Sequence, residues 1–146
     1  MNRPFVPAAL ILAILAGCAT RPLPDEVYRG YEGPDLPDAS AVTFKWAHAF
    51  GACAEVVDDL LPDCSRYGSV KLAPGVHHFQ LRRTFGVSVM VDPRMEATYS
   101  ASFDVNLEAG HAYSFRSDRT YGRGYRVFFW VEDDDTGRVV WGSKKS

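Results

Sequence analysis

The sequence predicts an all-β fold, an antiparallel meander of about seven to nine strands that packs as a β-sandwich. From residue 41 onward, short apolar runs alternate with polar residues, and this period of two is typical of half-buried strands. Glycine, proline and aspartate separate the runs at intervals of about 8–12 residues, which is the spacing of a sandwich or a barrel. No stretch of this region has a long helical period.

The alternating runs give the expected strands in chain order. They cover residues 42–46, 70–72, 76–81, 87–91, 101–107, 113–115, 127–131 and 139–141. Residues 54–61 are the best candidate for a short helical turn, although Val56 and Val57 fit a strand equally well. The core is expected to contain Phe44, Trp46, Leu72, Phe79, Leu81, Phe103, Val105, Leu107, Tyr113, Phe115, Phe129 and Val131.

Three turns are expected between these strands. Pro74 and Gly75 fit the central positions of a type II turn, because proline presets φ and glycine accepts a positive φ. Gly110 marks a second reversal, and residues 133–137 close a hairpin.

Residues 1–17 have the pattern of an export signal. Arg3 supplies a positive charge, an apolar stretch follows over residues 5–15, and small residues lead to Cys18. The apolar stretch is shorter than the roughly 20 residues that a membrane-spanning helix needs.

The stretch Leu15-Ala16-Gly17-Cys18 resembles the lipobox of bacterial lipoproteins. This resemblance implies cleavage before Cys18 and a diacylglyceryl group on its thiol. Ala19, where aspartate would retain an enterobacterial lipoprotein in the inner membrane, implies an outer-membrane anchor facing the periplasm. The alternative is an ordinary signal peptide followed by a chance cysteine.

Residues 18–40 are rich in proline, which predicts an extended tether. Residues 41–146 are expected to form a single β-domain. Residues 70–77 (VKLAPGVH) and 107–113 (LEAGHAY) resemble hairpin segments of bacterial envelope lipoproteins and of PEGA-type β-domains. The Ile-Asp-Gly turn that often precedes them is replaced by Val57-Asp58-Asp59. The resemblance implies a fold and transfers no catalytic residue.

The charge balance and the two remaining cysteines restrict the partners. The formal net charge is −2, and removal of residues 1–17 with Arg3 makes it −3, which argues against a nucleic-acid partner. Cys53 and Cys64 are expected to form a disulfide in an oxidising compartment. Two buried thiols or a metal site are the alternatives.

No metal site or cofactor is predicted. His77 and His78 are adjacent, so in a strand they point to opposite faces, and His111 reaches one of them only across strands. The three aspartates at 133–135 lack the alternating oxygen ligands of an EF-hand and fit a solvated hairpin tip better.

Residues 116–126 hold four arginines, two tyrosines and two glycines. Arginine forms bidentate contacts with phosphate or carboxylate, and tyrosine offers a stacking face. The candidate anion-binding residues are Arg116, Arg119, Tyr121, Arg123, Tyr125 and Arg126. The alternative is an exposed hairpin loop that arginine keeps soluble.

The sequence contains no G-x-S-x-G elbow, no H-E-x-x-H pair and no phosphate-binding loop. It therefore favours a non-catalytic binding or structural role in the envelope, with the membrane and anionic envelope components or another envelope protein as partners. The alternatives are a hydrolase of envelope polymers and an accessory subunit of an assembly or transport machine.

The anchor is tested by Cys18→Ser. This change should abolish the incorporation of labelled palmitate and release the protein from its lipid anchorage, because the acylated thiol is lost. Cys53→Ser is the control and should keep the label. A parent chain that carries no label on Cys18 would refute the anchor.

Overall fold

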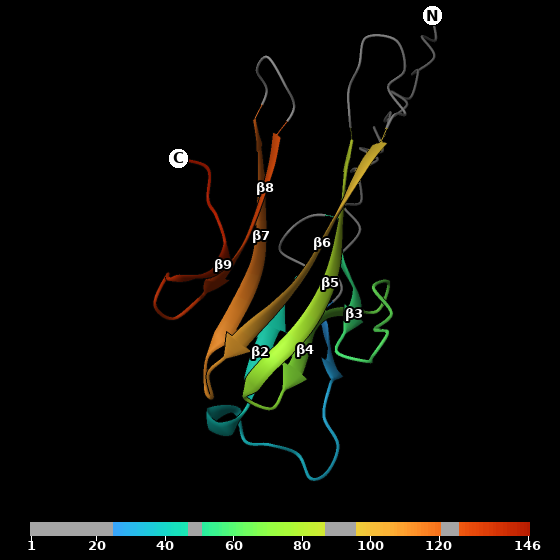
Figure 1. Cartoon of the computed structure of the whole chain (residues 1–146). Coiled ribbons are helices and arrows are strands. Elements are labelled where there is room, and N and C mark those ends of the chain that lie inside the picture. The colour runs from blue at the N-terminus through green and yellow to red at the C-terminus, as the bar shows by residue number, and fades with distance from the viewer. Residues whose placement is uncertain (1–24, 47–50, 87–95, 121–125) are drawn as a thin grey trace, which may run out of the picture.

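The computed structural model describes residues 25–46, 51–86, 96–120 and 126–146. These residues form nine strands and one short 3₁₀-helix, η1 (Asp38–Ser40) (Figure 1). The strands are β1 (Glu26–Arg29), β2 (Val42–Lys45), β3 (Ala52–Val57), β4 (Tyr67–Leu72), β5 (Gly75–Gly86), β6 (Glu96–Leu107), β7 (Ala112–Thr120), β8 (Arg126–Asp133) and β9 (Val139–Gly142).

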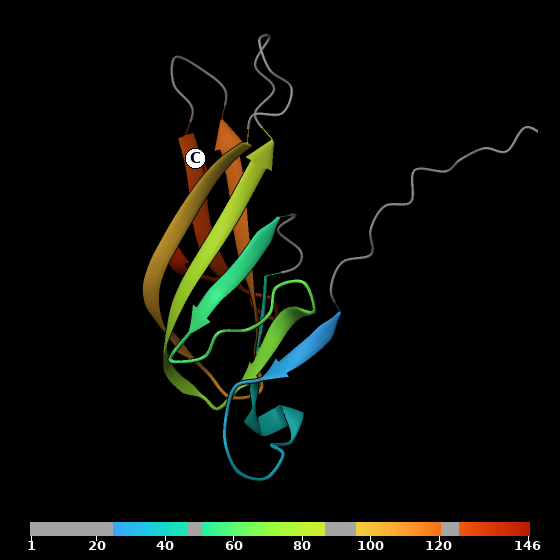
Figure 2. The ribbon, with the colours of Figure 1, turned by 90° about the vertical axis from the view of Figure 1, so that its right-hand side faces the viewer.

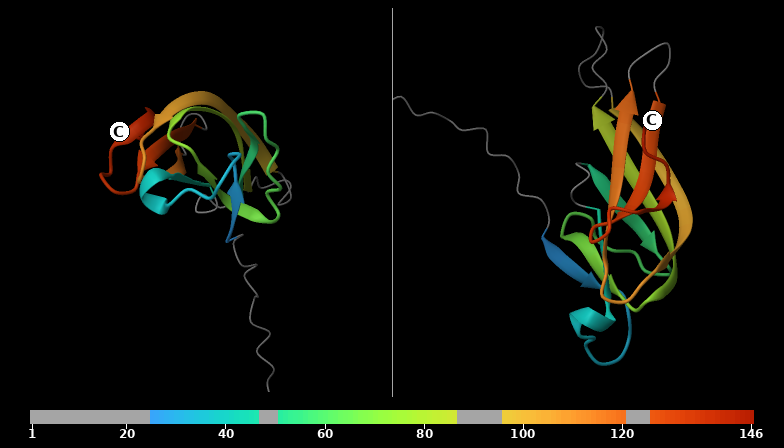
Figure 3. Two further views of the ribbon diagram at one scale, coloured as in Figure 1. Left: turned by 90° about the horizontal axis from the view of Figure 1, so that it is seen from below. Right: turned by 90° about the vertical axis from the view of Figure 1, so that its left-hand side faces the viewer.

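The strands form two sheets, which confirms the all-β sandwich. A six-stranded sheet has the order β1-β4-β2-β7-β8-β9, and a three-stranded sheet has the order β3-β5-β6. Seen edge-on, the smaller sheet lies across the larger one, and viewed along the strands both curve around the shared interior (Figures 2 and 3).

The connectivity differs from a simple antiparallel meander. Strand β1 pairs with β4 in parallel and β2 pairs with β7 in parallel, while the remaining pairs are antiparallel. The turn at Pro74 and Gly75 joins β4 of the large sheet to β5 of the small one, so it is not a hairpin. Gly75 has φ +140°, well beyond the roughly +80° of a type II turn. Gly110 likewise lies at a change of sheet, with φ +77°.

A bulge explains why residues 54–61 resemble a helical turn. Residues 52–57 form β3, whose register against β5 shifts between Ala54 and Val56. The bulge places Ala54 and Val57 on the buried side, three residues apart, which is a helix-like spacing produced by a strand.

The expected tether contributes to the sheet. Residues 26–29 form β1, and the Tyr28 ring meets the Tyr67 ring edge-on with centroids 5.0 Å apart. Lys71 then pairs with Asp38 at 3.1 Å, which fastens the chain between β1 and β2 to the body. The sandwich therefore begins before residue 41. The strand expected over residues 87–91 lies outside the described residues.

A row of stacked aromatic rings joins the two sheets. Phe44 of β2 stacks on Phe79 of β5, with ring centroids 4.0 Å apart. Phe79 neighbours Phe103 of β6 at 5.6 Å, and Phe103 stacks on Trp141 of β9 at 3.9 Å. The row thus crosses from the large sheet to the small one and returns. The other expected core residues are also buried, except Phe129, which is partly buried and packs against the core.

The expected disulfide is present. Cys53 on β3 bonds to Cys64 in the loop before β4, with Cα atoms 5.4 Å apart. The bond fastens the outer edge of the small sheet to the chain that enters the large one. Among the described residues, no helix has the length and the apolar character needed to cross a membrane.

Removal of the disulfide tests its contribution to stability. The double variant Cys53→Ala and Cys64→Ala should lose about 3 kcal/mol of unfolding free energy, because the unfolded chain regains the entropy of an open loop. Denaturant unfolding without reductant measures the loss, and reduction of the parent protein is the control and should produce a similar loss. A parent protein with unchanged stability in reductant would contradict the bond.

Candidate functional site

Strands β7 and β8 extend beyond the rest of the large sheet. Strand β2 pairs only with residues 112–114 of β7, and β9 pairs only with residues 130–132 of β8. Among the described residues, the ladder partners of residues 115–120 and 126–129 are each other, except that the Phe129 carbonyl also accepts from the N–H of Ser143 at 3.1 Å. We call these residues the projecting ribbon (Figure 1).

The outward face of the ribbon carries arginine beside aromatic rings. The period of two places Arg116 on this face with Trp130 as its cross-strand partner, and Arg126 with Thr120 as its partner. Arg116 and Arg126 are exposed, whereas Phe128 and Trp130 are half-buried on the same side. Two guanidinium groups thus lie on one face with two ring surfaces, and the exposed carboxylate of Asp118, opposite Phe128, lies between them.

The inward face receives the third arginine of the expected set. Arg119 lies over the ring of Phe85 in β5, with 5.4 Å between the guanidinium carbon and the ring centroid. Arg83 lies over the same ring at 4.6 Å, and its Nε donates to Ser117 Oγ at 3.1 Å. Arg119 therefore packs between the sheets, and the structure separates it from Arg116 and Arg126.

The remaining members of the expected set lie outside the described residues. They are Tyr121, Arg123 and Tyr125, and the same holds for Cys18.

Acidic groups at the base of the ribbon partly neutralise its charge. Asp134 accepts hydrogen bonds from Lys45 Nζ at 3.1 Å and Ser114 Oγ at 2.9 Å, and it lies 3.6 Å from Arg116. Glu132 pairs with Lys144. Hydrogen bonds from Lys144 and from the Trp130 indole lower the pKa of the Glu132 carboxyl, so it is ionised at neutral pH.

The small sheet carries a serine, a histidine and an aspartate in hydrogen-bonded sequence. His78 Nδ1 lies 2.7 Å from Asp104 Oδ1, and His78 Nε2 lies 3.3 Å from Ser102 Oγ. The register of β5 against β6 creates this arrangement, since His78 is opposite Asp104 and Ser102 is the next residue on that face. The order of groups is that of a nucleophilic triad.

The surroundings of these three residues are unlike those of a hydrolase. The outward residues of β5 and β6 are all exposed along this part of the sheet: Val76, His78, Gln80, Arg82, Ser100, Ser102, Asp104 and Asn106. Water reaches such a surface freely, whereas stabilisation of an oxyanion depends on fixed donors in a site that excludes water.

His77 confirms the expected alternation, because it lies on the opposite face from His78. Its Nδ1 is 2.8 Å from Asp58 Oδ2 and its Nε2 is 2.7 Å from the carbonyl oxygen of Ala73. Both ring nitrogens thus have partners within the fold, and His77 connects β5 to the loops that contain Asp58 and Ala73.

The third histidine of the described residues lies at the end of the sandwich opposite the ribbon tip. His111 Nδ1 is 2.9 Å from Asp133 Oδ2 and 3.7 Å from Asp135 Oδ2. Burial alone would raise the pKa of the Asp133 carboxyl, but the backbone N–H groups of Asp135 and Thr136 and the ring of His111 outweigh it and lower that pKa. In the sequence, His111 is more than 20 residues from the three aspartates, so this group is not predicted from sequence spacing.

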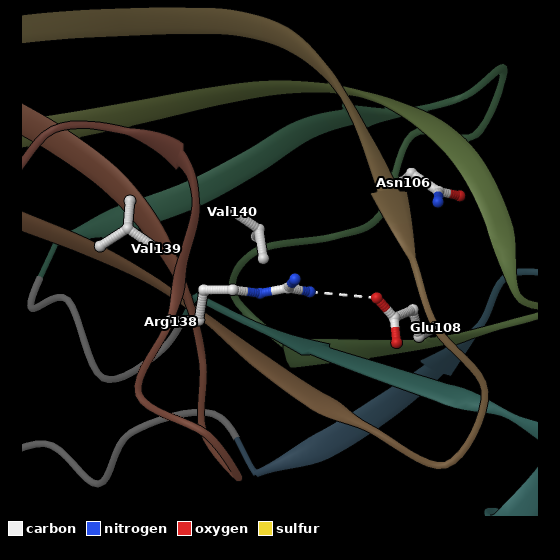
Figure 4. A pocket seen from close by; sticks show the side chains of 5 residues that line it. All are labelled: Asn106, Glu108, Arg138, Val139 and Val140. Atoms are coloured by element: carbon white, nitrogen blue, oxygen red, sulfur yellow. Dashed lines mark hydrogen bonds and ion pairs between the residues drawn. The ribbon is translucent and has the colours of Figure 1, made fainter.

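An open pocket of about 350 Å³ lies between the ends of β6 and β9. Figure 4 shows Arg138 and Glu108 reaching toward each other across it, with 3.0 Å between Nη2 and Oε1. Asn106, Val139 and Val140 complete its lining. The ion pair occupies the polar part of this pocket.

Comparisons with protein-family models, with curated proteins and with solved structures each found no match.

Proposed function

We propose that the protein is an envelope lipoprotein, anchored to the outer membrane through Cys18 and facing the periplasm, that works as a non-catalytic binding module. Its ligand is an anionic envelope component, and the outward face of the projecting ribbon makes the contact. The observation that carries this proposal is the placement of Arg116 and Arg126 beside Phe128 and Trp130 on a ribbon that extends past its sheet.

The chemistry of this face suits phosphate or carboxylate groups carried on an amphipathic molecule. Guanidinium groups bind such anions through paired N–H donors. Half-buried aromatic rings beside them offer apolar contact without the cost of exposing a large hydrophobic patch. Lipopolysaccharide and anionic phospholipid combine both features, and peptidoglycan supplies the carboxylates alone.

Two further features support an exported location. The Cys53–Cys64 disulfide is of the kind that persists in oxidising compartments. The first strand of the described residues begins at Glu26, eight residues after Cys18, so a lipid on Cys18 would hold the body close to the membrane. Each arginine near an anionic membrane surface contributes about 1 kcal/mol to binding.

Charge removal on the ribbon tests the proposal. The chain from residue 18, with Cys18→Ser to remove the lipid, contains every described strand and is mixed with anionic vesicles, lipopolysaccharide or peptidoglycan. The double variant Arg116→Gln and Arg126→Gln should bind its preferred material more weakly by about 2 kcal/mol, roughly 30-fold. Moderate salt should weaken the parent chain, because exposed charges are screened.

The matched control is Arg66→Gln with Arg82→Gln. Both arginines have exposed side chains away from the ribbon, and the change in net charge is the same. This control should bind like the parent chain. Equal losses of affinity in both double variants would mean that net charge alone decides binding. No loss of affinity in either would reject the ribbon as the binding face.

One observation favours a second candidate, a hydrolase. It is the hydrogen-bonded order of Ser102, His78 and Asp104. The exposed surface around these residues argues against it, because it provides no enclosed site for a substrate.

Ester hydrolysis distinguishes the two candidates. Ser102→Ala should leave the rate of p-nitrophenyl acetate hydrolysis at that of the parent chain, since a serine on an open surface has no enclosed site with fixed donors for the oxyanion. Ser100→Ala, on the same exposed face of β6, is the control. A rate that falls with Ser102→Ala and holds with Ser100→Ala would favour the hydrolase over the binding module.

A further inference from the structure

Two turns meet at the end of the sandwich away from the ribbon tip. His111 follows Gly110 in the connection from β6 to β7, and Asp133 and Asp135 lie where β8 turns into β9. The pairing of β7 with β8 places Tyr113 opposite Asp133, so the residues before Tyr113 lie alongside the residues after Asp133. The register thus brings a histidine within reach of two aspartates more than 20 residues away along the chain.

We propose that His111, Asp133 and Asp135 form a site for a divalent transition metal ion, with zinc as the preferred ion. Their ligand atoms all lie within 4.8 Å of one another. The distances from His111 Nδ1 are 2.9 Å to Asp133 Oδ2 and 3.7 Å to Asp135 Oδ2. These values bracket the separation of about 3.3 Å between two ligands of a tetrahedral zinc ion.

The fold holds the central ligand in position. Asp133 is 1% exposed. Its Oδ1 accepts hydrogen bonds from the N–H groups of Asp135 at 2.9 Å and Thr136 at 3.1 Å, which leaves Oδ2 directed at the imidazole. Asp135 Oδ2 also accepts from the N–H of Ala112 at 3.3 Å. Such outer hydrogen bonds orient ligands in metal sites before the ion arrives.

Charge balance favours a cation at this place. A proton on Nδ1 of the imidazole could be donated to only one of the two carboxylates. Among the ion pairs of the described residues, Asp133 and Asp135 have His111 as their sole partner, while Asp134 between them faces Lys45 and Arg116 on the other side. A divalent ion would replace the proton and neutralise both carboxylates together.

The ligand types select the ion. Calcium and magnesium take oxygen ligands, so an imidazole at the centre of the site argues against them. One nitrogen and two carboxylate oxygens suit zinc, with water in the fourth position. The disulfide keeps Cys53 and Cys64 from competing for it.

Zinc titration by calorimetry tests the site. The chain from residue 18 with Cys18→Ser, free of any histidine tag, should bind one zinc ion. His111→Gln and Asp135→Asn should each weaken this binding roughly tenfold or more, since each removes a ligand. Asp135 is exposed, so its substitution keeps the test open if His111→Gln fails to fold. A visible absorption band of tetrahedral cobalt(II), present in the parent chain and lost in both variants, is the second measurement.

The matched control is His78→Gln. His78 also pairs with one carboxylate, Asp104 at 2.7 Å, but has no second carboxylate in reach among its described ion pairs. It should bind zinc like the parent chain, and calcium should not displace the ion. Absence of saturable one-to-one binding, or folded His111→Gln and Asp135→Asn variants that both retain the parent affinity, would overturn the proposal.

Discussion

The stack of four aromatic rings across the interior is the interaction on which the rest of the fold depends. Phe79 contacts Phe44 in the opposite sheet and Phe103 in its own, and Phe103 contacts Trp141 in the opposite sheet. Each aromatic pair contributes about 0.5–1.5 kcal/mol beyond the burial of its surface. Because the row begins in the large sheet and ends there, it fixes the spacing of the two layers at two separate places.

The row of rings holds the two sheets together, and its position determines which parts of the molecule are available for contacts with a ligand. The rings lie in the middle of the sandwich, where β2, β5, β6 and β9 overlap, and β5 with β6 and β7 with β8 continue past that region as paired strands. Between these extensions, Arg83 and Arg119 both pack on the ring of Phe85. The outward faces then carry mainly polar and charged groups, with Val76, Phe128 and Trp130 as apolar exceptions.

The sequence predicts the strands and the core well because both follow from alternation, which is a local property. It does not predict the pairing, which depends on contacts far apart in the chain. Pro74 and Gly75 look the same whether they close a hairpin or carry the chain to another sheet. Because of the bulge in β3, Ala54 and Val57 face the same side although they are three residues apart, and the bulge is visible only in the pairing with β5. The group around His111 is hidden for the same reason, since its members are joined by the register of β7 and β8.

Backbone geometry gives the consecutive residues Asp133, Asp134 and Asp135 different environments, although in the sequence they form one acidic run. Asp133 ends β8 facing inward and is buried, so it accepts backbone hydrogen bonds and faces His111. Asp134 faces outward, where Lys45, Ser114 and Arg116 surround it. Asp134 is closer to Lys45, at 3.1 Å, than to Arg116, at 3.6 Å, and the Arg116 side chain stays 44% exposed. Lys45 therefore provides most of the charge compensation for Asp134, and the half-exposed guanidinium of Arg116 keeps donors for another anion.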